Sequence, residues 1–345
     1  MIAAALLLTL SAAAPMNSPL PNARIDRQEA SLDRLIDPAA KFTKLGEGYG
    51  WSEGPVWIED GQYLLFSDVP GNRIHKWSAA EGVTVWRDPS GGDGPAKPGF
   101  REPGTNGLKI GFPGEILAGD HGSRAVTAID LATKTKRLLV AEFGGAKFNS
   151  PNDLTVAPDG TIWFTDPPYG LEGLNDSPLK QQKVNGVYRA STDGIAVLVE
   201  PSLSFPNGIV FSPDAKTLYV TVSDPKRAII MAYDVTADQK LARPRVFSDM
   251  TAMVGNKNPG LPDGVVVDQY GNVWSTGPGG VHVFTPAGKR IGIIRTGTGI
   301  ANLAFGGPDG RTLFLTSHNM LVSIPTKVRG GPIRRPLAME TGERG

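Results

Sequence analysis

The sequence of 345 residues contains no cysteine. This absence excludes disulfide bonds, thiolate metal ligands and a cysteine nucleophile. The sequence also lacks an excess of charge of either sign, because 35 Lys and Arg residues nearly balance 34 Asp and Glu residues. Nucleic-acid binding depends on a basic surface that neutralises phosphates, so nucleic acid is not an expected partner. Small neutral or weakly anionic molecules remain possible substrates.

Long apolar runs are scarce. The segment Met1–Ala14 is apolar, but it is too short to span a bilayer, and its apolar run ends in small residues before Pro15. We interpret residues 1–20 as a signal peptide, or as a disordered leader, since no Lys or Arg precedes the apolar run. A signal peptide predicts a periplasmic or secreted protein, whereas a leader that is not a signal peptide predicts a cytoplasmic one. No other stretch is long enough for a membrane helix, so no membrane partner is expected.

Helical patterns are also scarce. Amphipathic stretches of ten or more residues are almost absent after Pro38, which disfavours a doubly wound α/β fold. A helix over Gln28–Ile36 is expected only in an N-terminal extension of residues 21–40. The rest of the chain consists of short apolar stretches separated by turn residues, which predicts an all-β protein.

One short pattern recurs six times between Trp51 and Pro325. Each copy opens with a polar residue and continues into a strand, a tight turn and a second strand rich in β-branched or aromatic residues. The openings are Glu53-Gly54, Asn106-Gly107, Asn152-Asp153, Asn207-Gly208, Asp263-Gly264 and Asn302-Leu303, with spacings of 53, 46, 55, 56 and 39 residues. Repeats of this length are typical of the blades of a β-propeller, so the sequence predicts a six-bladed β-propeller.

The predicted propeller spans residues 41–326. The segment Phe42–Leu45, upstream of the first repeat, is expected to supply a strand to the last blade, which would close the ring and remove exposed strand edges. Residues 327–345 are basic and rich in Gly and Pro, and we interpret them as a mobile C-terminal tail.

The six opening residues are predicted to lie at one end of the central channel. The second strand of a blade runs antiparallel to the first, so it ends on the face where the first begins. Three long polar insertions belong to connections on this face: Asp88–Gly104, Pro167–Gly186 and Asp249–Gly260. Long loops on a rigid scaffold often build binding sites, so a pocket is expected here.

The ring of openings offers only oxygen ligands, and Glu53, Asn152, Asn207 and Asp263 supply two carboxylates and two amide oxygens from four different blades. Calcium prefers about six to eight oxygen ligands, and water or substrate can complete its shell. Zinc would prefer nitrogen or sulfur. A single Asn-Gly or Asp-Gly pair could be only a turn, but recurrence at equivalent positions favours a residue that faces the channel. The sequence therefore predicts a central divalent-metal site, with Ca²⁺ as the preferred ion.

Motifs around these four residues point to a known family. They are Ser52-Glu53-Gly54-Pro55-Val56-Trp57, Ser150-Pro151-Asn152-Asp153-Leu154, Phe205-Pro206-Asn207-Gly208 and Pro262-Asp263-Gly264-Val265. Together they resemble those of the gluconolactonase, senescence marker protein (regucalcin) and luciferin-regenerating enzyme family, over about Lys41 to Pro325. Asp120-His121-Gly122 is similar to bacterial gluconolactonase-like members. The resemblance implies a six-bladed propeller with one divalent metal on the same four residues, and Zn²⁺, Mn²⁺ or Mg²⁺ as alternatives to Ca²⁺.

The predicted reaction is calcium-dependent hydrolysis of a sugar lactone, in which the metal polarises the carbonyl and a carboxylate activates water. Asp263 is the leading candidate for the general base, and His121 is the alternative because its usual pKa suits neutral pH. Regucalcin-like members carry an arginine at the position of Ser150, so sugar recognition is expected to differ. The candidate substrate contacts are Asn106, His121, Asn152, Tyr169 and His318.

Two other functions remain open. Calcium polarises a phosphoryl oxygen as well as a carbonyl, so the same site could hydrolyse organophosphates or other activated esters. A secreted binding propeller with structural calcium is the non-catalytic alternative, since a fold does not fix a function. A metal with open positions facing a pocket would favour catalysis, and a sealed shell would favour a structural role.

Overall fold

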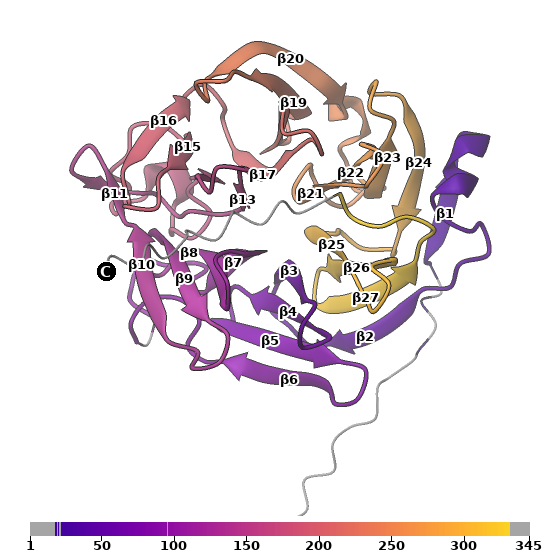
Figure 1. The fold of residues 1–345 in the computed structure, drawn as a ribbon, viewed down its shortest axis with the longest axis horizontal. Coiled ribbons are helices and arrows are strands. Elements are labelled where there is room, and N and C mark those ends of the chain that lie inside the picture. Colours follow the sequence, from indigo (N-terminus) through magenta and orange to yellow (C-terminus); the bar gives the residue numbers. More distant parts are fainter. Residues whose placement is uncertain (1–17, 19, 21, 95, 332–345) are drawn as a thin grey trace, which may run out of the picture.

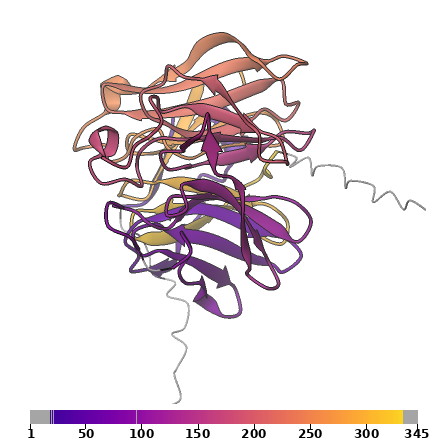
Figure 2. The same cartoon turned by 90° about the vertical axis from the view of Figure 1, so that its left-hand side faces the viewer.

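The computed structural model describes residues 18, 20, 22–94 and 96–331. Its strands form six antiparallel sheets arranged in a ring around a central channel (Figure 1). In the side view most strands run across the thickness of the ring (Figure 2). The prediction of an all-β six-bladed propeller is confirmed.

In each blade, strands that are consecutive in the sequence are neighbours in the sheet. The first four blades have four strands each, the fifth has β1 as an additional strand, and the last takes its fourth strand, β2, from the N-terminal part of the chain. From the channel outward, the blades are β3 (Ser52–Ile58), β4 (Tyr63–Asp68), β5 (Arg73–Ser78) and β6 (Gly82–Arg87); β7 (Thr105–Ile110), β8 (Glu115–Asp120), β9 (Ala125–Asp130) and β10 (Lys136–Val140); β13 (Leu154–Val156), β14 (Ile162–Thr165), β15 (Val187–Ala190) and β16 (Ala196–Glu200); β17 (Pro206–Phe211), β18 (Thr217–Asp224), β19 (Arg227–Val235) and β20 (Leu241–Asp249); β21 (Val265–Val267), β22 (Val273–Gly277), β23 (Gly280–Phe284) and β24 (Arg290–Arg295); and β25 (Asn302–Gly306), β26 (Thr312–Ser317) and β27 (Met320–Pro325). A small hairpin of β11 (Glu142–Phe143) and β12 (Ala146–Lys147) and two short 3-10 helices, η2 (Leu174–Asp176) and η3 (Thr251–Met253), lie in the connections.

The N-terminal part of the chain closes the ring. Strand β2 (Thr43–Glu47) pairs with β27 as the outer strand of the last blade, which confirms the closing strand expected at Phe42–Leu45. Strand β1 (Arg24–Arg27) adds a fifth strand to the fifth blade by pairing with β24. The ring is thus fastened by two strands that come from before the first repeat.

The helix expected over Gln28–Ile36 is shorter than predicted. Only η1, a 3-10 helix over Ala30–Arg34, forms. The backbone amides of Gln28 and Glu29 both donate to the carbonyl of Ile291, so this part of the chain is still held along the fifth blade. Burial of Leu32 and Ile36 against the last two blades then fixes the single turn.

The C-terminal tail also differs from the prediction. The backbone amide of Lys327 donates to the carbonyl of Leu35, and that of Gly331 donates to the carbonyl of Val267, at 2.8 and 2.7 Å. Residues 327–331 are therefore packed on the propeller and do not form a mobile tail. Residues 332–345, and nearly all of the predicted leader of residues 1–20, lie outside the described residues. None of the helices in the described part of the chain has the length and apolar character needed to cross a membrane.

The apolar core lies between neighbouring blades. Trp163 of β14, for example, packs with Ile209 and Val220 of the next blade. Both faces of a blade are covered, so consecutive residues such as Leu64 and Leu65 are both fully buried. Because the apolar side chains pack between the blades, polar residues can line the channel.

Candidate metal and substrate site

One end of the channel opens into a cavity of about 1050 Å³. Five of the six predicted opening residues line it: Glu53, Asn106, Asn152, Asn207 and Asp263. The sixth, Asn302, donates a hydrogen bond through Nδ2 to Oε2 of Glu53, at 3.2 Å. The structure therefore brings the four candidate metal ligands into one cavity.

Irregular pairing at the start of the inner strands turns these residues toward the channel. In β3 the register with β4 shifts between Glu53 and Val56, and β7 and β17 show the same kind of shift near Asn106 and Asn207. Strands β13 and β21 begin only after the opening residue. A bulge removes a residue from the regular ladder and re-aims its side chain, so Glu53, Asn106 and Asn207 can face the axis.

Hydroxyl groups on the second strands fix the backbone of the opening residues. Thr165 Oγ1 donates to the carbonyl of Asn207 at 2.7 Å, and Thr221 Oγ1 donates to the carbonyl of Asp263 at 2.6 Å. Each hydroxyl therefore ties one blade to the next beside the channel. Such Thr residues could have been found as a recurring polar position within otherwise apolar strands.

Glycine follows four of the openings because neighbouring blades approach closely there. A Cβ at Gly208 would overlap the carbonyl oxygen of Asp263, and a Cβ at Gly54 would overlap that of Asn106. The glycines of these pairs are thus required by the packing of the inner strands around the axis.

Two carboxyl groups lie in a poorly solvated part of the cavity. Burial raises the pKa of Glu53, and burial together with the negative charge of Glu53 raises the pKa of Asp263. Oδ1 of Asp263 and Oδ1 of Asn106 are buried and have no hydrogen-bond partner. Unpaired buried oxygens of this kind are costly unless a cation or a proton donor meets them. The arrangement can therefore hold a cation that prefers oxygen ligands.

A family model for the SMP-30/Gluconolactonase/LRE-like region matches residues 51–319. The chain belongs to this family. It is 38% identical over 311 residues to a gluconolactonase of Zymomonas mobilis subsp. mobilis, which covers 89% of this chain and 87% of that protein. The solved structure of a gluconolactonase from Xanthomonas campestris is 32% identical, covers 90% of this chain and 98% of that chain, and has a TM-score of 0.74.

A more distant similarity concerns a different substrate. The diisopropyl-fluorophosphatase of Loligo vulgaris is 26% identical over 302 residues, which cover 82% of this chain and 90% of that protein. The family resemblance seen in the sequence motifs is confirmed.

The two histidines chosen from the sequence do not line this cavity. His121 is fully buried, and its Nδ1 lies 3.2 Å from the carbonyl oxygen of Glu102. Burial lowers the pKa of His121 to about 3. His318 is exposed and its ring packs edge-on against Trp51. Tyr169, in contrast, lines the cavity and stacks on Phe205.

Sequence reasoning missed several residues that line the cavity, and two of them are charged. Arg101 and Glu102 line the cavity beside the candidate metal ligands. They belong to the insertion Asp88–Gly104, whose length was the only signal in the sequence. Ser150 is buried and structural, because its hydroxyl donates to the carbonyl of Pro167 and accepts from the amide of Gly170.

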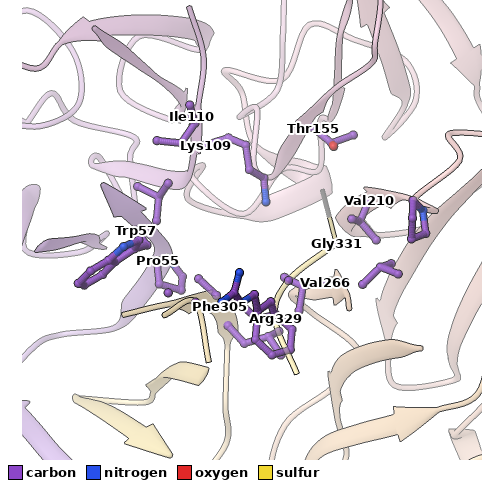
Figure 3. Close-up of a pocket in the computed structure, with 18 of the residues that line it drawn as sticks. Pro55, Trp57, Lys109, Ile110, Thr155, Val210, Val266, Phe305, Arg329 and Gly331 are labelled. Atoms are coloured by element: carbon purple, nitrogen blue, oxygen red, sulfur yellow. The ribbon is translucent and has the colours of Figure 1, made fainter. Parts of the chain in front are cut away.

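The other end of the channel holds a second, smaller cavity of about 470 Å³ (Figure 3). The ends of the inner strands and the segment Arg329–Gly331 line it. The side chains of Lys109 and Arg329 extend into it among apolar residues such as Val266 and Phe305. None of the four candidate metal ligands lines this cavity, so the two mouths of the channel are lined by different residues.

Proposed function

We propose that this protein hydrolyses a sugar lactone with a bound divalent cation, preferably Ca²⁺. The observation that carries the proposal is the pairing of two buried carboxyl groups, Glu53 and Asp263, in a cavity where an Asp263 oxygen has no partner. The identity with the Zymomonas gluconolactonase supports the choice of a lactone.

The donor set suits a hard cation. Glu53 and Asp263 supply carboxylate oxygens, and Asn152 and Asn207 supply amide oxygens from two further blades. Among the described residues, no three His, Cys, Asp or Glu side chains converge as a metal site, and oxygen-only sets of this kind favour Ca²⁺ over Zn²⁺. When bound, the ion would polarise the lactone carbonyl and stabilise negative charge on its oxygen.

Asp263 is the proposed general base. Its unpaired Oδ1 can accept a proton from a water molecule as that water attacks the carbonyl carbon. The acyl C–O bond of the ring then breaks, and the proton passes to the released ring oxygen, which leaves a hydroxy acid. His121 is poorly placed for this role because it lies outside the cavity lining and its pKa is lowered by burial.

Side chains around the base would orient the lactone. Asn106 presents its unpaired Oδ1, and Tyr169 and Trp51 provide aromatic surface in the same cavity. An amide oxygen accepts a hydrogen bond from a hydroxyl group, and a ring face covers apolar C–H edges. These contacts suit a polar ring held against a partly apolar wall.

The experiment is acid release from D-glucono-δ-lactone by chelated protein, before and after Ca²⁺ is added. We expect turnover that requires Ca²⁺ and is lost in Glu53→Gln. The same protein is tested on diisopropyl fluorophosphate, because the similarity to the diisopropyl-fluorophosphatase of Loligo vulgaris favours an activated phosphate ester as the second candidate. Tight Ca²⁺ binding without turnover of either compound would overturn the catalytic proposal and leave a binding propeller.

A further inference from the structure

Two of the long insertions, Asp88–Gly104 and Pro167–Gly186, contact each other at the wall of the cavity. Phe100 and Leu171 form an isolated antiparallel bridge, and the backbone amides of Arg101 and Glu102 both donate to the carbonyl of Gly170, at 3.0 and 3.3 Å. Gly170 is held in turn by Ser150, whose hydroxyl accepts from its amide at 2.9 Å. The turn that carries Arg101 and Glu102 is therefore fixed by backbone hydrogen bonds to the third blade.

His121 also holds this turn in place. Its ring nitrogen contacts the carbonyl of Glu102, and its backbone amide donates to the carbonyl of Gly104 at 3.2 Å. Its ring also packs closely against Gly170, where an added Cβ would come within 2.8 Å of the imidazole. His121 is thus a positioning residue for the turn.

The two side chains on this turn form an ion pair at the cavity wall. Arg101 is 49% exposed, whereas Glu102 is only 15% exposed. Both residues line the same cavity as Asp263 and Tyr169. The pKa of Asp263 is raised mainly by burial and by the charge of Glu53, and the negative charge of Glu102 adds to this effect. The pair therefore lies within electrostatic range of the proposed base and of the aromatic wall.

We propose that Arg101 and Glu102 form a subsite for adjacent hydroxyl groups of a polyhydroxylated lactone, an inference that rests on the proposed function. A guanidinium offers several donors in one plane, and a carboxylate offers only acceptors. A hydroxyl group both donates and accepts, so two neighbouring hydroxyls can bond to the two members of the pair at once. A lactone without hydroxyls would displace water from this ion pair without replacing the hydrogen bonds to that water, which disfavours its binding.

A second ion pair of the same kind serves as a control. Arg137 and Glu115 form a pair with exposures of 53% and 18%, and neither residue lines the cavity. The two pairs match in residue type and exposure but differ in location. A general effect of losing an Arg–Glu pair would therefore show in both.

The test compares Arg101→Met and Glu102→Gln with the control Arg137→Met in the full-length, calcium-saturated protein. We measure kcat/KM for D-glucono-δ-lactone and for δ-valerolactone, which has the same ring without hydroxyl groups. The ratio of the two values is expected to fall at least about tenfold in the first two variants and to stay unchanged in the control. Unchanged melting temperatures are expected, since backbone groups hold the turn.

A binding measurement separates this inference from the proposed function. 1,5-Anhydro-D-glucitol carries ring hydroxyls but no lactone bond, and calorimetry gives its Kd for each variant. A Kd at least about tenfold weaker in Arg101→Met supports the subsite even if neither lactone is hydrolysed. An unchanged lactone ratio with an unchanged Kd in Arg101→Met overturns the subsite, as does a wild-type protein that turns over neither lactone and does not bind this polyol.

Discussion

The two mouths of the channel are formed by opposite ends of the same inner strands, yet their chemistry differs. At the start of the strands, carboxylate and amide side chains line a cavity of about 1050 Å³. At the end of the strands, apolar residues line a cavity of about 470 Å³ together with four charged residues, Glu59, Lys109, Asp309 and Arg329 (Figure 3). The difference arises from the backbone, because bulges turn the first residues toward the axis whereas regular pairing and tight hairpins end the strands.

This comparison indicates that the candidate functional residues lie where the pairing of the inner strands is irregular, at the start of these strands. The hairpin end is constrained by pairing and leaves little freedom to place side chains. The other end has bulges and also receives the long insertions that carry Arg101 and Glu102. Changes at the start of the strands should therefore affect activity, and matched changes at their ends should not.

The largest effect is expected from Asp263→Asn. The amide cannot take the proton from water, so kcat for lactone hydrolysis should fall by about 10³-fold. The matched control is Asp309→Asn at the opposite mouth, where the side chain accepts a hydrogen bond from the amide of Arg311. Equal activity of the two variants in a pH-stat assay would remove Asp263 from the role of base.

A smaller effect is expected from Glu53→Gln on Ca²⁺ affinity. Removal of one of two carboxylates should weaken binding by about 100-fold, because charge on the ligands tunes calcium affinity. Isothermal titration calorimetry measures the change, and Glu59→Gln at the opposite mouth is the control. Matching losses in both variants would show that overall charge, not the site, determines affinity.

The metal-free protein should lose stability as the pH rises. Burial raises the pKa of Glu53 above its usual value near 4.5, and burial raises that of Asp166 to about 7. Between the unfolded and folded pKa values the folded state binds more protons, so the free energy of unfolding falls with rising pH, by on the order of 1–3 kcal/mol.

Urea unfolding of chelated protein at pH 5 and pH 8 measures this slope. Glu53→Gln should reduce it, because the amide does not titrate, and saturating Ca²⁺ should oppose it. A free energy of unfolding that rises with pH in the chelated wild type would contradict the assignment.

The smallest effect is expected from Gly208→Ala. Its added methyl group meets the carbonyl oxygen of Asp263, so the blades must move apart and the free energy of unfolding should fall by about 1–3 kcal/mol. Gly94→Ala is the control, since open space surrounds that position. Equal melting temperatures for the two variants would mean that the inner strands can move apart without a loss of stability.

Much of the fold was predictable because each blade is encoded by a contiguous stretch. The opening at Asn207, the strand that follows and its turn are neighbours in the sequence, so their pattern repeats visibly. The four candidate metal ligands were found for the same reason, and the structure places them in one cavity. Their role in metal binding stays a prediction.

The residues that were misjudged depend on contacts between distant segments. Residues 327–331 pack on the ring because Lys327 bonds to Leu35 and Gly331 bonds to Val267. Strand β1 joins the fifth blade, which lies far from it in the sequence. No local pattern encodes such pairings.

The sequence by itself therefore determined the number of blades, the closing strand and the ring of polar openings, since all of these follow from local periodicity repeated along the chain. Only the tertiary structure decided that Arg101 and Glu102 reach the cavity while His121 lies buried beneath them. That outcome depends on hydrogen bonds from the backbone amides of Arg101 and Glu102 to the carbonyl of Gly170 in another insertion, and insertions have no periodicity from which such docking can be read.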